Sequence, residues 1–176
     1  MTQNIFFIGP ASVGKSTVAK LLAEELGYNF VDVDLAFCER IALIPDYIDT
    51  NGYVAYCQRN SELVDQLLLE YPTKTVFATP SGFLVHEQSP DLVAKHSMLV
   101  NENALSVLLL PSKDPHQTAE LIAQRQKVRW PEINKQTEIE RYIARHKKYK
   151  SYGKLKIVGL YSPKQTVDLI MDQSAP

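Results

Sequence analysis

The stretch Gly9-Pro10-Ala11-Ser12-Val13-Gly14-Lys15-Ser16-Thr17 decides how this chain folds. It fits the pattern G-x-x-x-x-G-K-[ST], in which the backbone N–H groups of a glycine loop and the positive end of the next helix surround a polyphosphate. Residues 4–8 (NIFFI) before it are an apolar run typical of a buried strand, and residues 18–26 after it have apolar side chains at helical spacing and end at Gly27. Strand, glycine loop and helix in this order predict a nucleotide-phosphate loop.

Different residues of the loop are expected to bind different parts of a nucleotide and its metal ion. Lys15 can reach the terminal phosphates, and the Ser16 hydroxyl can bind Mg²⁺. We therefore expect ATP and Mg²⁺ as cofactors. The predicted nucleotide-binding residues of the loop are Gly9, Ala11, Ser12, Val13, Gly14, Lys15, Ser16 and Thr17.

Length and composition limit the class of protein. A chain of 176 residues suits one domain, 1–176, and its 45% hydrophobic and 22% charged residues with a net charge of −1 are those of an ordinary globular protein without a nucleic-acid partner. No segment approaches a membrane-spanning length, and residues 1–8 do not resemble a signal peptide. We therefore expect a cytoplasmic monomer that does not bind membranes, with Cys38 and Cys57 as free thiols.

Positive charge is concentrated in the last third of the chain. Residues 1–110 contain 6 Lys and Arg against 13 Asp and Glu, whereas residues 111–176 contain 13 against 7. A basic region of this kind suits a protein that handles an anionic nucleotide and an anionic acceptor. Many of these lysines would individually suit a solvated helix face as well.

The order of predicted elements indicates an α/β fold. Further strands are predicted at 29–33, 74–78, 104–110 and 154–160, and further helices at 35–42, 53–69, 90–100, 116–126, 137–149 and after Ser162-Pro163. This alternation predicts a mainly parallel five-stranded sheet with helices on both faces.

Residues 44–46 are predicted to break a helix, and residues 172–176 to form a loose tail. The polar, basic stretch 127–136 predicts a mobile loop, which we interpret as a lid at about 126–136.

Two acidic residues at the end of the second predicted strand are candidates for the chemistry. Strand alternation places Asp32 and Asp34 on one side, at the edge where open α/β sheets bind ligands. Asp32 could complete the Mg²⁺ shell with Ser16, and Asp34 could orient an acceptor hydroxyl and take its proton, although each could also be a hydrated acid. Arg129, on the predicted lid, could move onto the β- and γ-phosphates. The histidines show no ligand spacing and are expected at the surface.

Together these features resemble the shikimate kinase family over nearly the whole chain. The matching pieces are GPASVGKST at 9–17, FVDVD at 30–34, Glu39-Arg40, Asn51-Gly52, Arg129 before Trp130-Pro131, and the Arg145-x-x-x-Tyr149 pattern. The resemblance implies a P-loop fold like that of nucleoside monophosphate kinases and ATP-dependent phosphorylation of shikimate in aromatic amino acid biosynthesis. It also implies that Ser16 and Asp32 bind Mg²⁺. Arg125 would lie near the adenine, and Arg145 would clamp the acceptor carboxylate.

Two substitutions set this chain apart from the family pattern at the acceptor. The family's Gly-Gly-Gly after the third strand is Pro80-Ser81-Gly82 here, and its Phe-Arg is Tyr56-Cys57. Ser81 and Gly82 remain expected acceptor contacts. Arg59 could replace the missing arginine only if the helix register shifts, because it lies about 200° round the helix from Cys57.

Several functions remain open from the sequence. The leading hypothesis is an ATP-dependent kinase acting on a small anionic acceptor, either shikimate or a related hydroxy acid. A nucleoside or nucleotide monophosphate kinase is a second hypothesis. A nucleotide-binding module that has lost its acceptor site is a third, kept open by Cys57 and residues 80–82.

Overall fold

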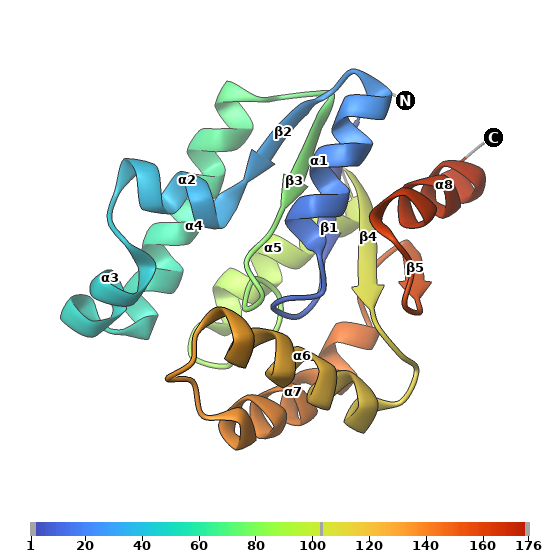
Figure 1. Cartoon of the computed structure of the whole chain (residues 1–176). Coiled ribbons are helices and arrows are strands. Elements are labelled where there is room, and N and C mark those ends of the chain that lie inside the picture. Colours follow the sequence, from blue (N-terminus) through green and yellow to red (C-terminus); the bar gives the residue numbers. More distant parts are fainter. Residues whose placement is uncertain (1–2, 103, 175–176) are drawn as a thin grey trace.

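Five parallel strands form a sheet with the order β2-β3-β1-β4-β5 in the computed structural model, which describes residues 3–102 and 104–174 (Figure 1). All neighbouring strands pair in parallel, which confirms the predicted fold class. The elements are β1 (Asn4–Ile8), α1 (Lys15–Leu26), β2 (Asn29–Asp32), α2 (Val33–Arg40), α3 (Ile44–Asn51), α4 (Tyr53–Glu70), β3 (Thr75–Ala78), α5 (Pro90–Glu102), β4 (Ala104–Leu110), α6 (Pro115–Arg129), α7 (Lys135–Lys150), β5 (Leu155–Val158) and α8 (Pro163–Ser174).

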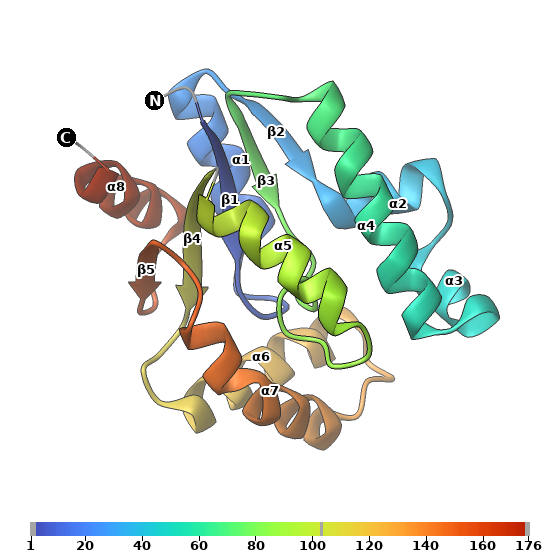
Figure 2. The same cartoon turned by 180° about the vertical axis from the view of Figure 1, so that it is seen from behind.

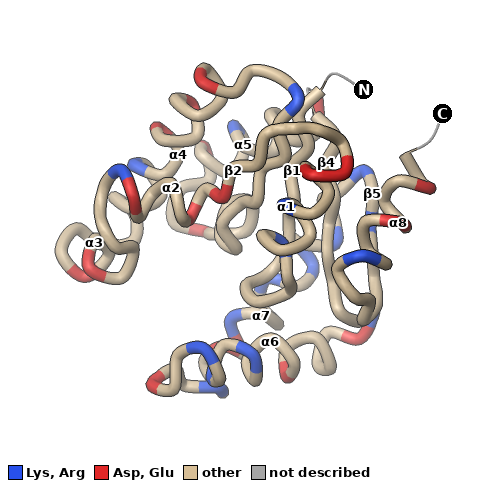
Figure 3. Tube along the Cα trace, turned by 45° about the horizontal axis from the view of Figure 1, so that its top comes forward, with Lys and Arg blue, Asp and Glu red and all other residues tan. Residues whose placement is uncertain are grey.

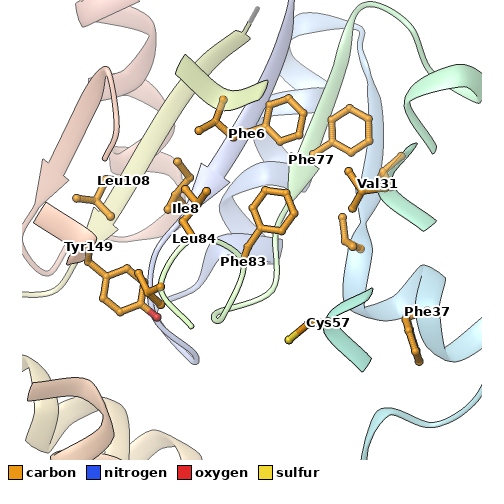
Figure 4. Packing of buried hydrophobic residues seen from close by; sticks show 14 of the residues in the cluster. Phe6, Ile8, Val31, Phe37, Cys57, Phe77, Phe83, Leu84, Leu108 and Tyr149 are labelled. Carbon is orange, nitrogen blue, oxygen red and sulfur yellow. The ribbon is translucent and has the colours of Figure 1, made fainter. Parts of the chain in front are cut away.

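Helices cover both faces of the sheet, so its central strands are mainly apolar and buried on both sides rather than alternating between polar and apolar residues. Every residue of β1 and β3 is buried. On one face, Phe6, Phe77 and Leu108 pack in the cluster that α4 and α5 complete (Figures 2 and 4). On the other face, Ile5 and Phe7 pack in the cluster that α1 and α8 complete.

The carboxyl ends of the strands meet at one edge, and the loops that follow β1, β2 and β3 gather there. The α6–α7 hairpin lies across this edge (Figures 1 and 2). Both β3 and β4 pair with β1, so the chain leaves β1 at the point where the strand order reverses. Open α/β sheets bind ligands at this kind of switch point, and here the glycine loop occupies it.

The structure corrects several predicted boundaries. The predicted break at 44–46 is the start of α3, because Pro45 sits in its first turn, where a missing N–H costs little. The predicted loop at 127–136 was wrong at both ends. Helix α6 continues to Arg129 and α7 begins at Lys135, so only residues 130–134 connect them. Helix α8 continues to Ser174, which overturns the tail prediction for 172–174, while residues 175–176 lie outside the described part.

Local capping explains the short α6–α7 connection. The Asn134 side chain accepts hydrogen bonds from the N–H groups of Gln136 and Thr137 at 3.0 and 3.2 Å. The Lys127 ammonium donates to the carbonyl groups of Pro131 and Ile133. A polar stretch can therefore form two helix ends joined by a tight turn. The sequence pattern alone did not distinguish this arrangement from a long loop.

Candidate active site

A cavity of about 360 Å³ lies at the carboxyl edge of the sheet, beside the glycine loop. The structure brings Lys15, Ser16, Asp32, Asp34 and Arg129 to it, as the sequence predicted. The full lining is Ala11, Ser12, Gly14, Lys15, Ser16, Thr17, Asp32, Asp34, Thr79, Ser81, Arg125, Arg129 and Trp130.

The backbone of the glycine loop is shaped for an anion. Ser12 and Gly14 have positive φ angles of 57° and 97°, and Gly14 is the N-cap of α1. No side chain caps α1, so the first N–H groups of this helix are left for a ligand. Gly9 anchors the start of the loop, since a Cβ there would lie 2.6 Å from the carbonyl oxygen of Leu109.

Lys15 is held inside the loop in the free protein. Its Nζ donates to the carbonyl oxygens of Gly9 at 2.9 Å and Pro10 at 2.8 Å. Burial lowers the pKa of Lys15 to about 8, and the charges of Asp34 and Asp32 oppose this fall. The ammonium therefore lies beside the site where phosphates would bind, next to two carboxylates.

Asp32 and Asp34 share the cavity for a different reason than strand alternation. The strand β2 ends at Asp32, which caps α2 by accepting from the N–H of Leu35 at 3.1 Å. Asp34 lies in the first turn of α2, so the prediction that it continues the strand was wrong. The turn from strand to helix still aims both carboxylates at Lys15, whose charge interacts with each.

The environment of Asp34 makes its carboxylate a better proton acceptor. Burial raises the pKa of Asp34, while the nearby Lys15 charge lowers it. The hydroxyl of Tyr56 on α4 points at Oδ1 of Asp34 from 3.5 Å. From the sequence, Tyr56 was named only as part of the Tyr56-Cys57 pair, and its contact with Asp34 was not predicted. The signal available was its place at i+3 from Tyr53 on the apolar face of α4, a face that turns toward the site.

A second cavity of about 440 Å³ adjoins the first, and Ala11 and Ser81 border both. Its lining is Pro10, Ala11, Ile48, Tyr53, Ser81, Gln88, Ile122, Gln126, Glu138, Arg141, Tyr142, Arg145 and Tyr149. The two cavities together can hold a nucleotide phosphate chain and a small acceptor side by side.

Arg145 brings a positive charge to this second cavity. Within residues 3–102 and 104–174 it forms no ion pair with a carboxylate. It interacts instead with the hydroxyls of Tyr53 and Tyr149. Tyr149 also donates to the carbonyl oxygen of Ser81 at 2.6 Å, which ties α7 to the loop after β3. Neutral partners leave the guanidinium available to an anion.

The other arginine of this cavity is already paired. Arg141 donates to Glu138 at 2.6 Å, and Gln126 donates to the same carboxylate at 3.0 Å. Lys and Arg are nevertheless frequent along α6 and α7, the hairpin over the site (Figure 3). The concentration of positive charge in the last third of the sequence is thus placed beside the two cavities.

The remaining predicted acceptor residues differ in their placement. Ser81 borders both cavities. Gly82 lies under Tyr53, since a Cβ there would be 2.5 Å from the Tyr53 hydroxyl. The structure does not bring Arg59 to either cavity. Arg59 pairs with Glu62 at 2.7 Å along α4.

A third hollow of about 190 Å³ extends from the glycine loop toward β5, and Val13, Gly14 and Thr17 border it. Arg125 lies between this hollow and the phosphate cavity, and its Nη1 donates to the carbonyl oxygen of Ser12 at 3.1 Å. An apolar hollow with an arginine at its mouth suits the base of a nucleotide.

Arg129 rests on an aromatic ring in the free protein. Its guanidinium carbon lies 4.4 Å from the centre of the Trp130 ring, and both residues border the phosphate cavity. From the sequence, Trp130 was quoted only as the residue that follows Arg129 in the family resemblance. Helix α6 ends at Arg129, and Trp130 is the residue that follows this end, so Trp130 lies next to a candidate catalytic arginine.

Two histidines are buried, contrary to the expectation that all lie at the surface. His86 is 5% exposed and His96 is 3% exposed. His96 bridges the Phe83 carbonyl oxygen at 3.2 Å and the Ser61 hydroxyl at 3.1 Å, and its ring stacks on Phe83. The described residues contain no cluster of three or more His, Cys, Asp or Glu side chains placed to hold a metal.

The fold and the paired cavities define a P-loop kinase. A sequence profile described as Shikimate kinase matches residues 11–174. This chain belongs to the shikimate kinase family, whose members are ATP-dependent kinases.

Individual relatives agree with this assignment. A shikimate kinase of Alkaliphilus oremlandii (strain OhILAs) is 36% identical over 90 residues, which span 51% of this chain and 52% of the relative, so the match covers about half the length of that protein. Shikimate kinase 2 of Yersinia pseudotuberculosis serotype O:3 (strain YPIII) is 28% identical over 120 residues, which span 66% of this chain and 67% of the relative.

Solved structures share the fold. The structure of shikimate kinase from Acinetobacter baumannii in complex with shikimate has a TM-score of 0.78 at 22% identity, covering 99% of this chain and 96% of that chain. The Aquifex aeolicus shikimate kinase has a TM-score of 0.72 at 22% identity, covering 96% and 94%. None of the helices in the described part of the present chain combines the length and apolar character needed to cross a membrane.

Proposed function

We propose that this protein transfers the γ-phosphoryl group of ATP to a hydroxyl of a small anionic acceptor, either shikimate or a related hydroxy acid. The observation that carries this proposal is the pair of adjoining cavities, with Lys15 and Asp34 in one and the unpaired Arg145 in the other. The family supports the reaction, and the site residues supply each part of it.

The residues of the phosphate cavity fit a magnesium ion. The Ser16 hydroxyl and the Asp32 carboxylate are the hard oxygen ligands that Mg²⁺ prefers, and both line the cavity. A bound Mg²⁺ would neutralise charge on the phosphates. Lys15 and the free N–H groups at the start of α1 would hold the same phosphates in place.

Asp34 is the proposed proton acceptor. In the transfer, the acceptor oxygen bonds to the γ-phosphorus, the bond from that phosphorus to the bridging oxygen breaks, and ADP leaves. The proton of the acceptor hydroxyl passes to Asp34, whose buried carboxylate has a raised pKa. Arg145 orients the acceptor through its carboxylate, and Arg129 is placed to neutralise charge on the transferred group.

The first test is acceptor-dependent production of ADP from ATP and Mg²⁺, with shikimate as the acceptor and an acceptor-free reaction beside it. Asp34→Asn should retain ATP binding and lose at least about 100-fold in kcat, because general-base catalysis contributes about 10²–10⁴. The exposed Asp172 on α8 supplies the matched control, and Asp172→Asn should turn over normally.

A nucleotide-binding module without transfer activity is the second candidate. It is favoured by Cys57, which stands where the family pattern has an arginine, and by the pairing of Arg141 with Glu138, which occupies the second arginine of the acceptor cavity. Tight ATP binding with no ADP release above the acceptor-free rate would support it and would contradict the kinase proposal.

A further inference from the structure

A small chamber lies behind the acceptor cavity, between α4 and the loop after β3. Its volume is about 20 Å³, and Tyr53 forms part of the wall of both spaces. The lining of the chamber is Tyr53, Tyr56, Cys57, Asn60, Pro80, Gly82, Phe83, His86 and His96. Figure 4 shows two residues of this lining, Cys57 and Phe83, among the buried side chains of the core.

Two deeply buried polar atoms line this chamber without a partner. Nδ2 of Asn60 and Nδ1 of His86 form no hydrogen bond in the structure. Their residues are only 4% and 5% exposed. Buried polar groups are almost always hydrogen-bonded, because leaving one unpaired is costly. Two such atoms in one chamber indicate that the chamber is suited to bind a polar group.

The size and chemistry of the chamber select a hydroxyl group. A volume of about 20 Å³ holds one water-sized group and is too small for the two oxygens of a carboxylate. Asn60 Nδ2 is a donor, and His86 Nδ1 is a donor or an acceptor according to the tautomer. A hydroxyl oxygen can accept two hydrogen bonds, or accept one and donate one, so it satisfies either tautomer.

The chamber is electrically neutral. Burial lowers the pKa of His86, with further lowering by Arg145 and Lys148. Burial raises the pKa of both Tyr53 and Cys57. At neutral pH none of these groups is therefore charged, and an anionic group would find no counter-charge inside the chamber.

The chamber is next to the positive charge of the acceptor cavity. The Tyr53 hydroxyl interacts with Arg145, and the ring of Tyr53 meets that of His86 edge-on at 6.3 Å between centroids. A carboxylate held by Arg145 would consequently lie close to Tyr53, the residue that lines both the acceptor cavity and the chamber. A hydroxyl on a neighbouring position of the same molecule could reach Asn60 and His86.

We propose that Asn60 and His86 form a hydroxyl-binding subsite of the acceptor cavity, and that the acceptor is a hydroxy acid with a hydroxyl on the carbon that bears its carboxylate. The inference rests on the proposed kinase function and narrows its substrate class. Cys57 and Asn60 stand at i and i+3 on α4 and therefore share one face of this helix. This face is neutral, whereas the family pattern has an arginine at the position of Cys57.

Two ring acids test this proposal. Quinate has a hydroxyl on the carbon that bears the carboxylate, and shikimate has none there. The intact protein should show a lower KM for quinate than for shikimate. Asn60→Leu keeps a similar volume and removes the donor. It should shift the ratio of kcat/KM for quinate to that for shikimate by about tenfold toward shikimate.

His86→Phe provides a second variant and should shift the same ratio in the same direction. Asn101→Leu, at an exposed position of α5, is the matched control and should leave the ratio unchanged. Thermal unfolding of each variant shows whether it is folded.

Two outcomes would overturn the inference, and they are distinguishable. Acceptor-dependent turnover with no preference for quinate, and no shift in Asn60→Leu or His86→Phe, would overturn the subsite and leave the kinase proposal intact. This is the result expected if the chamber holds only a water molecule. No acceptor-dependent turnover with either acid would overturn the kinase proposal and the subsite together.

Discussion

Burial acts on Lys15 and Asp34 in opposite directions, and their proximity limits both effects. Desolvation lowers the pKa of the Lys15 ammonium to about 8 and raises the pKa of the Asp34 carboxyl, while each charge stabilises the other. Lys15 therefore remains mostly cationic at neutral pH. Burial makes Asp34 more basic than an exposed aspartate, which suits the proposed role of this residue as proton acceptor.

The burial of His96 predicts a contribution to acid stability. Burial lowers its pKa from 6.5 to about 4, so the native protein keeps it neutral where the unfolded chain protonates it. Stability is therefore lost as the pH falls from about 6.5 to about 4, by up to about 3 kcal/mol. Denaturant unfolding at a series of pH values checks this.

The matched variants for His96 separate its contribution from that of other acids and bases. His96→Gln should remove most of the loss between pH 6.5 and 4, whereas His116→Gln, at an exposed position of α6, should retain it. Parallel pH curves for the wild type and His96→Gln would show that His96 does not govern acid unfolding.

At the scale of elements, the turn from β1 into the glycine loop depends on close packing against β4. Gly9 has a φ angle of 145°, and a Cβ on it would lie 2.6 Å from the backbone oxygen of Leu109. Gly27 ends α1 with a φ angle of 64°, and a Cβ there would meet nothing within 4 Å. Both glycines thus have positive φ angles, but they differ in the space around them.

This difference predicts unequal costs for the same substitution. Gly27→Ala should lower the free energy of unfolding by about 1 kcal/mol, the cost of the left-handed conformation alone. Gly9→Ala should cost at least about 1 kcal/mol more, because backbone atoms must move, and it should also weaken ATP binding. Chemical denaturation and nucleotide titration of both variants measure this, and equal losses would contradict the steric argument.

At the scale of the whole molecule, the α6–α7 hairpin supplies cations to both cavities. Arg129 comes from the end of α6 and Arg145 from the middle of α7 (Figure 1). A movement of this hairpin would therefore affect the nucleotide and the acceptor together. We propose that the region about 126–136 closes over ATP, although its connecting turn is only residues 130–134.

The single tryptophan of the chain reports on this movement. Trp130 carries the Arg129 guanidinium over its ring in the free protein. If Mg²⁺ and a nonhydrolysable ATP analogue draw Arg129 onto the phosphates, Trp130 emission should change, and Arg129→Ala should reduce that change. Unchanged emission in the wild type, together with unchanged protease cleavage within 127–136, would contradict closure.

The local pattern of the sequence was sufficient for the fold class and for the phosphate half of the site. A strand, a glycine loop and a helix are contiguous, so their geometry follows from neighbouring residues. The carboxyl ends of parallel strands must meet at one edge, which brought Asp32 and Asp34 to Lys15 even though Asp34 belongs to a helix. Helix ends were less predictable, because polar residues serve equally in loops, caps and exposed turns.

The make-up of the proposed acceptor cavity and of the chamber behind it depends on packing between distant segments. Tyr53 and Asn60 on α4, His86 after β3 and Arg145 on α7 have no common spacing in the sequence, and only the packing of α4 and α7 against the loop after β3 brings them together. The same packing buries His86 and His96 and leaves Arg59 paired with Glu62. Spacing along one helix fixes which side chains share a face, but which face meets a ligand depends on elements far away in the chain.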